Sequence, residues 1–195
     1  MAIIHRTTMN PGKLELLAAW LPAQPWYLPT GSAPDLARAG GFRLDDPEGE
    51  VGIEFMVVTD SSRGSATAYH VPVTYRGAPL EGAEAGLIGT SEHGELGLRW
   101  VYDGTHDPVL VERLHALFRG LAEPQAQSLS DTPDREVTAR YEGPGVPGAE
   151  GGPELTVVRV LSDTAAAGHL GEVIAHWTTP DGAAHRGVFA SLDAR

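Results

Sequence analysis

The sequence predicts an α+β protein in which a curved antiparallel β-sheet is packed by two main helices and extended by additional C-terminal β-strands. Three observations favour this class: a strand, a tight loop and an amphipathic helix in direct succession at 96–120, several segments with period-two hydrophobicity, and a β-rich final third. Neither helix can bury its apolar stripe alone, so both require the sheet.

The segment 96–120 carries the clearest local pattern. Apolar residues alternate along its first part and predict a strand with one buried face, formed by Leu96, Leu98, Trp100 and Tyr102. Asp103-Gly104 predicts a turn, because Asp tolerates and Gly prefers positive φ. Asp107 followed by Pro108 is typical of an N-cap and the first helical position, so we expect a helix from Pro108 to about 120.

The remaining elements are predicted from similar signals. Asn10-Pro11 and an apolar stripe indicate a first helix over about 11–21, and Pro72 indicates an edge strand or a bulge, since proline cannot donate a ladder hydrogen bond. The proline-rich run 22–34 should fold back over the core, because it carries Trp26 and Tyr27. The predicted strands are 42–44, 51–59, 66–75, 87–88, 96–102, 155–161, 171–178 and 183–192, with a weak one at 126–129.

Composition restricts the partners and the chemistry. The chain has 195 residues and no cysteine. Its formal net charge of -12 repels phosphate backbones and anionic lipid head groups, so we expect neither nucleic acid nor an anionic membrane as a partner. Its only lysine, Lys13, is expected on a surface helix, and no phosphate-binding glycine motif is present, so no cofactor is predicted. No signal peptide and no long apolar run are found, and we expect a cytoplasmic protein.

Candidate site residues lie in two places. The loop 103–107 contains Asp103, His106 and Asp107, which would suit acid/base chemistry, although turn and cap roles already explain both aspartates. Aromatic faces at Trp26, Tyr27 and Trp100, with Trp20, Tyr102 and Trp177, would suit a sugar platform, although core packing is the more usual role of such residues. The histidines match no metal-ligand spacing, so no metal site is predicted, and no catalytic residue is assigned.

Four sequence pieces together carry a family resemblance. They are LLAAWLPAQPWY at 16–27, YHVPVTYRG at 69–77, LIGT at 87–90 and RWVYDGTHDPV at 99–109. In this order and spacing they resemble the N-terminal cap domain of bacterial maltokinases over about residues 11–122. Pro25 stands where the family has an arginine. The resemblance implies a cystatin-like curved sheet with helices, a domain that precedes a kinase and supplies none of its catalytic residues.

The resemblance also implies a division of the chain and a role. Residues 1–122 form a cap-like domain, and residues 123–195 form a β-rich extension packed on the same sheet, in which no kinase lobes are found. We expect a non-catalytic interaction module of α-glucan, trehalose or maltose-1-phosphate metabolism, with a trehalose synthase or another glucan enzyme as its protein partner. The alternatives are a small carbohydrate-binding protein and an enzyme acting at the loop 103–107. Edge strands at Pro72 and at the C-terminus would allow a homodimer without requiring one.

Overall fold

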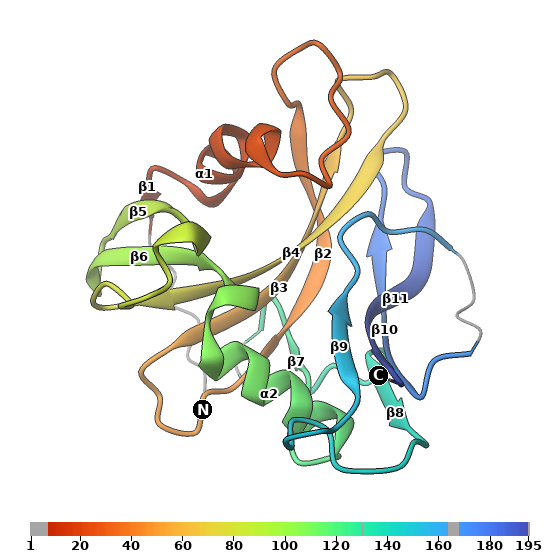
Figure 1. Ribbon diagram of the computed structural model, residues 1–195. Helices are drawn as coiled ribbons and strands as arrows, with labels where there is room; N and C mark the ends of the chain where they lie inside the picture. Colours follow the sequence, from red (N-terminus) through yellow and green to blue (C-terminus); the bar gives the residue numbers. More distant parts are fainter. Residues whose placement is uncertain (1–7, 130, 164–167, 195) are drawn as a thin grey trace.

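A mostly antiparallel eleven-stranded sheet and two α-helices make up the part of the chain that the computed structural model describes, residues 8–129, 131–163 and 168–194 (Figure 1). This confirms the predicted fold class. The strands are β1 (Met9–Asn10), β2 (Leu36–Leu44), β3 (Gly52–Asp60), β4 (Thr67–Arg76), β5 (Leu87–His93), β6 (Gly97–Asp103), β7 (Gln125–Ala126), β8 (Thr138–Tyr141), β9 (Glu154–Val157), β10 (Gly171–Thr178) and β11 (Ala184–Asp193). The α-helices are α1 (Lys13–Trp20) and α2 (Pro108–Phe118), and the short 3-10 helices are η1 (Leu21–Ala23), η2 (Glu84–Gly86) and η3 (Gly104–His106).

The strand order brings the two ends of the chain into one curved sheet. The order is β1-β5-β6-β4-β3-β2-β10-β11-β9, with β7 added to β2 and β8 added to β10. Beyond β9, the segment 158–161 returns to β4, where the amide of His70 donates to the carbonyl of Arg159 at 2.9 Å and the amide of Leu161 donates to the carbonyl of Ala68 at 2.9 Å. The sheet therefore curls around its inner face but is not closed.

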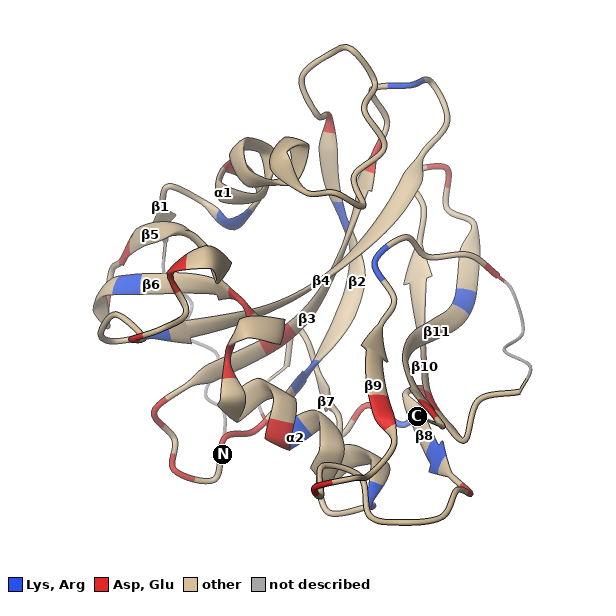
Figure 2. Ribbon diagram, in the orientation of Figure 1, with Lys and Arg blue, Asp and Glu red and all other residues tan. Residues whose placement is uncertain are grey.

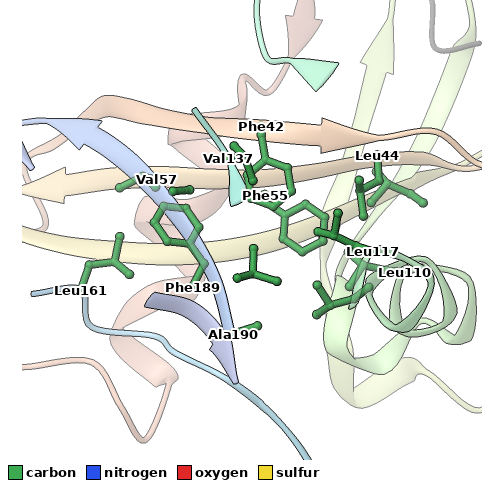
Figure 3. Close-up of a cluster of buried hydrophobic side chains, with 14 of the residues drawn as sticks. Phe42, Leu44, Phe55, Val57, Leu110, Leu117, Val137, Leu161, Phe189 and Ala190 are labelled. Atoms are coloured by element: carbon green, nitrogen blue, oxygen red, sulfur yellow. The ribbon is translucent and has the colours of Figure 1, made fainter. Parts of the chain in front are cut away.

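The inner face of the curl holds the larger hydrophobic core (Figure 3). Phe42 of β2 and Phe55 of β3 stack at 4.5 Å between ring centroids, and Phe189 of β11 lies 6.1 Å from Phe42. Helix α2 covers one end of this core with Leu110 and Leu114. Each fully buried side chain of this size contributes about 1.5–3 kcal/mol of hydrophobic free energy, so the elements on both sides of residue 122 stabilise one common core.

A second core lies on the opposite face of β3 and β4 under α1. Leu17 and Leu21 of the α1–η1 segment pack with Met56, Val71 and neighbouring residues. Strand β3 is thus buried on both faces, with its odd-numbered residues in the first core and its even-numbered ones in the second. Strand β4 likewise turns Tyr69, Val71 and Val73 to the second core, so the period-two pattern predicted for both strands is confirmed.

The buried face predicted for β6 is wrong. Leu96 is 43% and Leu98 is 39% exposed, whereas Val101 of the opposite face packs in the second core. The β5–β6 hairpin extends past the edge of β4, which pairs only with residues 100–103, so the first residues of β6 have no layer above them. Only the last part of the strand, with Tyr102 and Asp103, is buried.

Two edge-strand predictions are also wrong. Pro72 lies in β4, which is an inner strand between β3 and β6. It is tolerated because β6 pairs with β4 only from Val73 onward and the segment 159–161 meets β4 at 68–70, so no partner at Pro72 requires an amide donor. The C-terminal strand β11 lies between β10 and β9, and the strands that end the order are β1 and β9.

The helix predictions hold with one shift. Helix α2 begins at Pro108, and the Asp107 carboxylate accepts a hydrogen bond from the Val109 amide at 3.0 Å, as an N-cap should. Helix α1 begins at Lys13 with Gly12 as its N-cap residue, because Asn10 pairs with Glu92 as part of β1 and is therefore held outside the helix. The sequence also underestimated β2, which starts at Leu36, and missed β8.

Candidate functional site

The N-terminus of α2 carries a buried ion pair. Asp107 is fully buried, and its two carboxylate oxygens accept hydrogen bonds of 2.7 Å each from the Nε and Nη2 atoms of Arg76 on β4. Burial alone would raise the pKa of Asp107, but the hydrogen bonds from the Arg76 guanidinium and the Val109 amide hold this pKa below its ordinary value. The ion pair of Asp107 with Arg76 therefore joins α2 to the sheet.

A second buried ion pair lies at the end of β6. Asp103 receives hydrogen bonds of 2.9 and 2.7 Å from Nη2 of Arg159, which also donates to Oγ1 of Thr105 at 2.9 Å. The Thr105 amide and hydroxyl both bind the same aspartate, which fixes the start of η3. Arg159 lies just beyond β9, so this contact connects the C-terminal segment to the loop 103–107.

Arg159 also covers one of the predicted aromatic residues. The centre of its guanidinium lies 5.0 Å from the ring centroid of Trp26, a distance typical of a cation–π contact. The other neighbours of Trp26 are the rings of Trp20 and Tyr69, at 5.8 and 6.0 Å between centroids. The structure thus brings Trp26 and Asp103 together through Arg159.

Tyr27 lies beside this cluster but points into the protein. Its hydroxyl donates to the Asp60 carboxylate at 2.7 Å, and its ring packs 5.4 Å from that of Tyr69. The next amide, that of Leu28, donates to the Tyr69 hydroxyl at 3.2 Å. The proline-rich run therefore does fold back over the second core, with the aromatic rings as its anchors.

Trp100 and His106 remain outside the cluster. Trp100 is half-buried on β6, opposite Thr90 on one side and Arg76 on the other. His106 is exposed in η3 and lies against Gly86, where a Cβ atom would approach the His106 side chain to 2.5 Å. Neither Asp103 nor Asp107 hydrogen-bonds His106 in the part of the chain that the structure describes, so no acid–base pair is assembled there.

Trp177 is excluded as a surface platform. It is only 3% exposed, and His185 stacks on its ring at 5.4 Å with an interplanar angle of 14°. The alternating pattern of the last hairpin predicts that Trp177 lies on one face of the strand. It does not predict which of the two faces is buried in the curled sheet. Of the aromatic residues considered for sugar binding, Trp20, Trp26 and Trp100 are half-buried, while Tyr27, Tyr102 and Trp177 are buried.

Sequence reasoning missed the two arginines that organise the site and a third buried carboxylate. Glu54 of β3 accepts hydrogen bonds from Lys13, from the Tyr75 hydroxyl at 2.7 Å and from the side-chain Nε2 of Gln127 at 2.8 Å. Burial raises the pKa of Glu54, but the adjacent Lys13 and Tyr75 more than offset this effect and lower it. Lys13 is therefore not a solvated surface residue but the link between α1 and the sheet.

A cleft of about 500 Å³ opens next to the Arg159–Asp103 pair. One wall is α2, with Leu110, Val111, Leu114 and His115, and the other is β9 with its continuation to Arg159. Basic side chains are distributed over separate elements and form no continuous stripe along a described strand or helix (Figure 2). No group of three metal-ligating side chains occurs among the described residues, and neither described helix has the length and apolar character needed to cross a bilayer.

Comparison with known proteins adds one finding. Residues 20–107 match the family model of the maltokinase N-terminal cap domain. The matched segment runs from the last residue of α1 to the N-cap of α2, and it contains five of the seven longest strands. This domain is a part of maltokinase other than the kinase itself. No curated protein matches the chain. Residues 20–107 are thus similar to the maltokinase N-terminal cap domain, and the resemblance predicted from the sequence is confirmed.

Proposed function

We propose that this chain is a non-catalytic interaction module of α-glucan, trehalose or maltose-1-phosphate metabolism that binds a protein partner, a trehalose synthase or another glucan enzyme. The observation that carries the proposal is the match of residues 20–107 to a cap domain. The surface is the Trp26 loop, residues 22–34, together with the segment 158–161 that lies against it.

The geometry of this surface supports binding rather than catalysis. Asp103 and Asp107 are both held in ion pairs with arginines, so both carboxylates of the loop 103–107 already have structural partners. Leu28 and Val160 are 42% and 36% exposed and both lie next to Tyr69, through the Leu28 amide and a β-bridge from Val160. Contiguous exposed apolar patches are typical of interaction surfaces, and we propose that Leu28 and Val160 belong to one such patch.

Sugar binding has less support as an alternative. Trp177 is buried, and one neighbour of the Trp26 ring is already a guanidinium, so neither ring is fully open to a sugar. Trp100 is half-buried and has no aromatic neighbour among the described residues. A pyranose platform requires an accessible ring face, and the one described pair of half-buried candidate rings in contact, Trp20 and Trp26, meets edge to face, which supports a sugar platform less than parallel rings would.

The test is a pull-down from the lysate of the source cells with the tagged protein, read by mass spectrometry. We expect enrichment of a trehalose synthase, a kinase without its cap or another glucan enzyme. The enrichment should be lost with Trp26→Ala and with Leu28→Asp, which changes only an exposed residue of the same loop. Leu129→Asp, at a residue that is 57% exposed elsewhere, is the matched control and should retain it.

The proposal is overturned by two results. The first is a pull-down in which no protein is enriched over an untagged control. The second is an enriched glucan enzyme that binds the Leu28→Asp protein as well as the unchanged chain, because the Trp26 loop would then not contribute to the surface.

A further inference from the structure

The cleft between α2 and β9 has mainly apolar walls. Leu110, Val111 and Leu114 line it from the helix, and Leu155 and Val157 line it from the strand. Clefts of a few hundred Å³ with apolar walls and a small number of polar atoms are the usual form of a binding site. Its volume of about 500 Å³ would hold a short peptide segment.

One edge of this cleft is a strand edge without a partner. Strand β9 pairs with β11 on one side and ends the strand order on the other. The amide of Val158 donates to the carbonyl of Phe189 on β11, whereas Arg159 and Leu161 turn their backbone groups to β4. Since strand residues alternate, Leu155 and Val157 must turn their N–H and C=O groups away from β11. No described residue pairs with these groups.

Two buried polar atoms also lack a partner at the cleft. His115 of α2 is nine-tenths buried, and its Nδ1 atom has no hydrogen bond among the described residues. Nη1 of Arg159 is likewise buried without a partner, although Nη2 of the same guanidinium binds Asp103. Both residues line the cleft. Buried polar atoms normally have a hydrogen-bond partner, so these two atoms indicate that a bound molecule would supply one.

We propose that this cleft binds an extended peptide segment of another polypeptide, which adds to the free edge of β9 as a further strand. The N–H and C=O groups of Leu155 and Val157 would pair with the peptide backbone, and an apolar side chain would lie between α2 and β9. A carboxylate of the peptide, from an acidic side chain or a C-terminus, would accept a hydrogen bond from Nη1 of Arg159. The inference rests on the proposed function, because it assigns part of the partner contact to a defined site.

An extended peptide explains the cleft better than a small solute. Two donors and two acceptors at alternate residues of one strand form the pattern that a second strand completes, as in other cases of strand addition. The four residues of β9 span about 13 Å, at about 3.3 Å per residue, so roughly four peptide residues would fit along the edge. Beyond Val157 the chain turns to β4, which limits the site at that end.

The test measures amide hydrogen exchange by NMR in the full chain. The probe is a synthetic hexapeptide that alternates valine and threonine and ends in a free carboxylate, beside the same peptide with an amidated end. We expect the peptide to slow exchange at the amides of Leu155 and Val157, while Thr156 and Val158, already directed to β11, stay unchanged. The amidated peptide should bind about tenfold more weakly, the usual effect of losing a hydrogen bond to a charged group.

A pair of variants locates the site on the protein. Val111→Trp fills the cleft from α2 and should weaken peptide binding at least about tenfold. Leu121→Trp adds the same side chain at a residue that is 70% exposed beyond the end of α2, and it should leave binding unchanged. Circular dichroism and the melting temperature of both variants show whether the fold is retained, and the comparison is made between variants that retain it.

Three results would overturn the inference. The first is unchanged exchange at both amides in the presence of millimolar peptide. The second is protection of these amides in the protein alone that increases with protein concentration, which would mean that a second copy pairs with β9. The third is a partner from the pull-down that binds the Val111→Trp protein as tightly as the unchanged chain. That result leaves the proposed function standing and removes only this site.

Discussion

At the scale of single residues, His70 joins the inner strand β4 to the segment that follows β9. It is fully buried, its ring lies 4.5 Å from Phe189 and 5.9 Å from Phe55, and its Nδ1 atom lies 2.9 Å from the carbonyl of Val158. Because a carbonyl only accepts, Nδ1 carries a hydrogen, and the low pKa of the ring makes it neutral at pH 7. Burial, together with the nearby Arg159, lowers the pKa of His70 to about 3.

This neutral histidine predicts a specific pH dependence of stability. Above about pH 6.5 His70 binds no proton in the folded or the unfolded state. Between about pH 6.5 and pH 3 only the unfolded state binds one, because the pKa in the folded state is about 3. The free energy of unfolding should therefore fall by about 1.4 kcal/mol for each pH unit below about pH 6.5. We expect His70→Met to remove this slope. Urea unfolding of both proteins at pH 7, 6, 5 and 4 measures the difference, in which the shared carboxylates cancel. A difference that does not vary with pH would contradict the prediction.

The site residues show what a sequence can and cannot predict at this scale. Asp107 was predicted as an N-cap from its neighbour Pro108, and this local signal proved correct. Its partner Arg76 lies 31 positions away, and Arg159 lies 56 positions from Asp103. Buried carboxylates require a cation, but nothing in the local sequence indicates which arginine a curled sheet will bring to them. The sequence therefore predicted the cap residue of the loop 103–107 but not the arginines that pair with its aspartates.

At the scale of elements, the two glycines of β2 decide how the sheet bends. Gly40 has φ of 144° and Gly41 has φ of 126°, and the pairing with β3 shifts its register between Arg38 and Gly40. At this bend Gly40 pairs with Trp177, which is how β10 joins the sheet. Glycine weakens a strand pattern, so the sequence predicted a strand only at 42–44, although these glycines are what allow β2 to hold three neighbours.

Gly41→Ala should therefore destabilise the protein more than a glycine substitution in a loop. A Cβ atom at Gly41 would lie 2.0 Å from the carbonyl oxygen of Phe55, and the backbone is in a region that residues with a Cβ avoid, so we expect a loss of about 3–5 kcal/mol. Gly49→Ala is the matched control, because φ is 74° there and no atom lies within 4 Å of the added group. It should cost about 1 kcal/mol. Urea unfolding measures both, and equal losses would count against the argument.

At the scale of the whole molecule, the family match and the larger hydrophobic core cover different parts of the chain. The match ends at Asp107, but the larger core combines Phe42 and Phe55 with Leu110 of α2 and with Trp177 and Phe189 of the final hairpin. The division at residue 122, implied by the resemblance to the cap domain, remains a prediction about sequence regions. Period-two patterns predicted most strands, but the order in which they pair depends on contacts between the two halves, which no local pattern contains.

A shared core predicts that the regions 1–122 and 123–195 unfold as one cooperative unit. Without β10 and β11, Phe42 and Phe55 would lose the side chains that cover them, so neither region should keep its protection alone. Hydrogen exchange with mass spectrometry at increasing urea should give the same opening free energy for peptides covering 51–76 and 171–193. A fragment of residues 1–122 should show no cooperative transition. If peptides from 171–193 open at a clearly lower free energy while 51–76 stays protected, the extension is an independent unit, and its loss would leave the cap-like region folded.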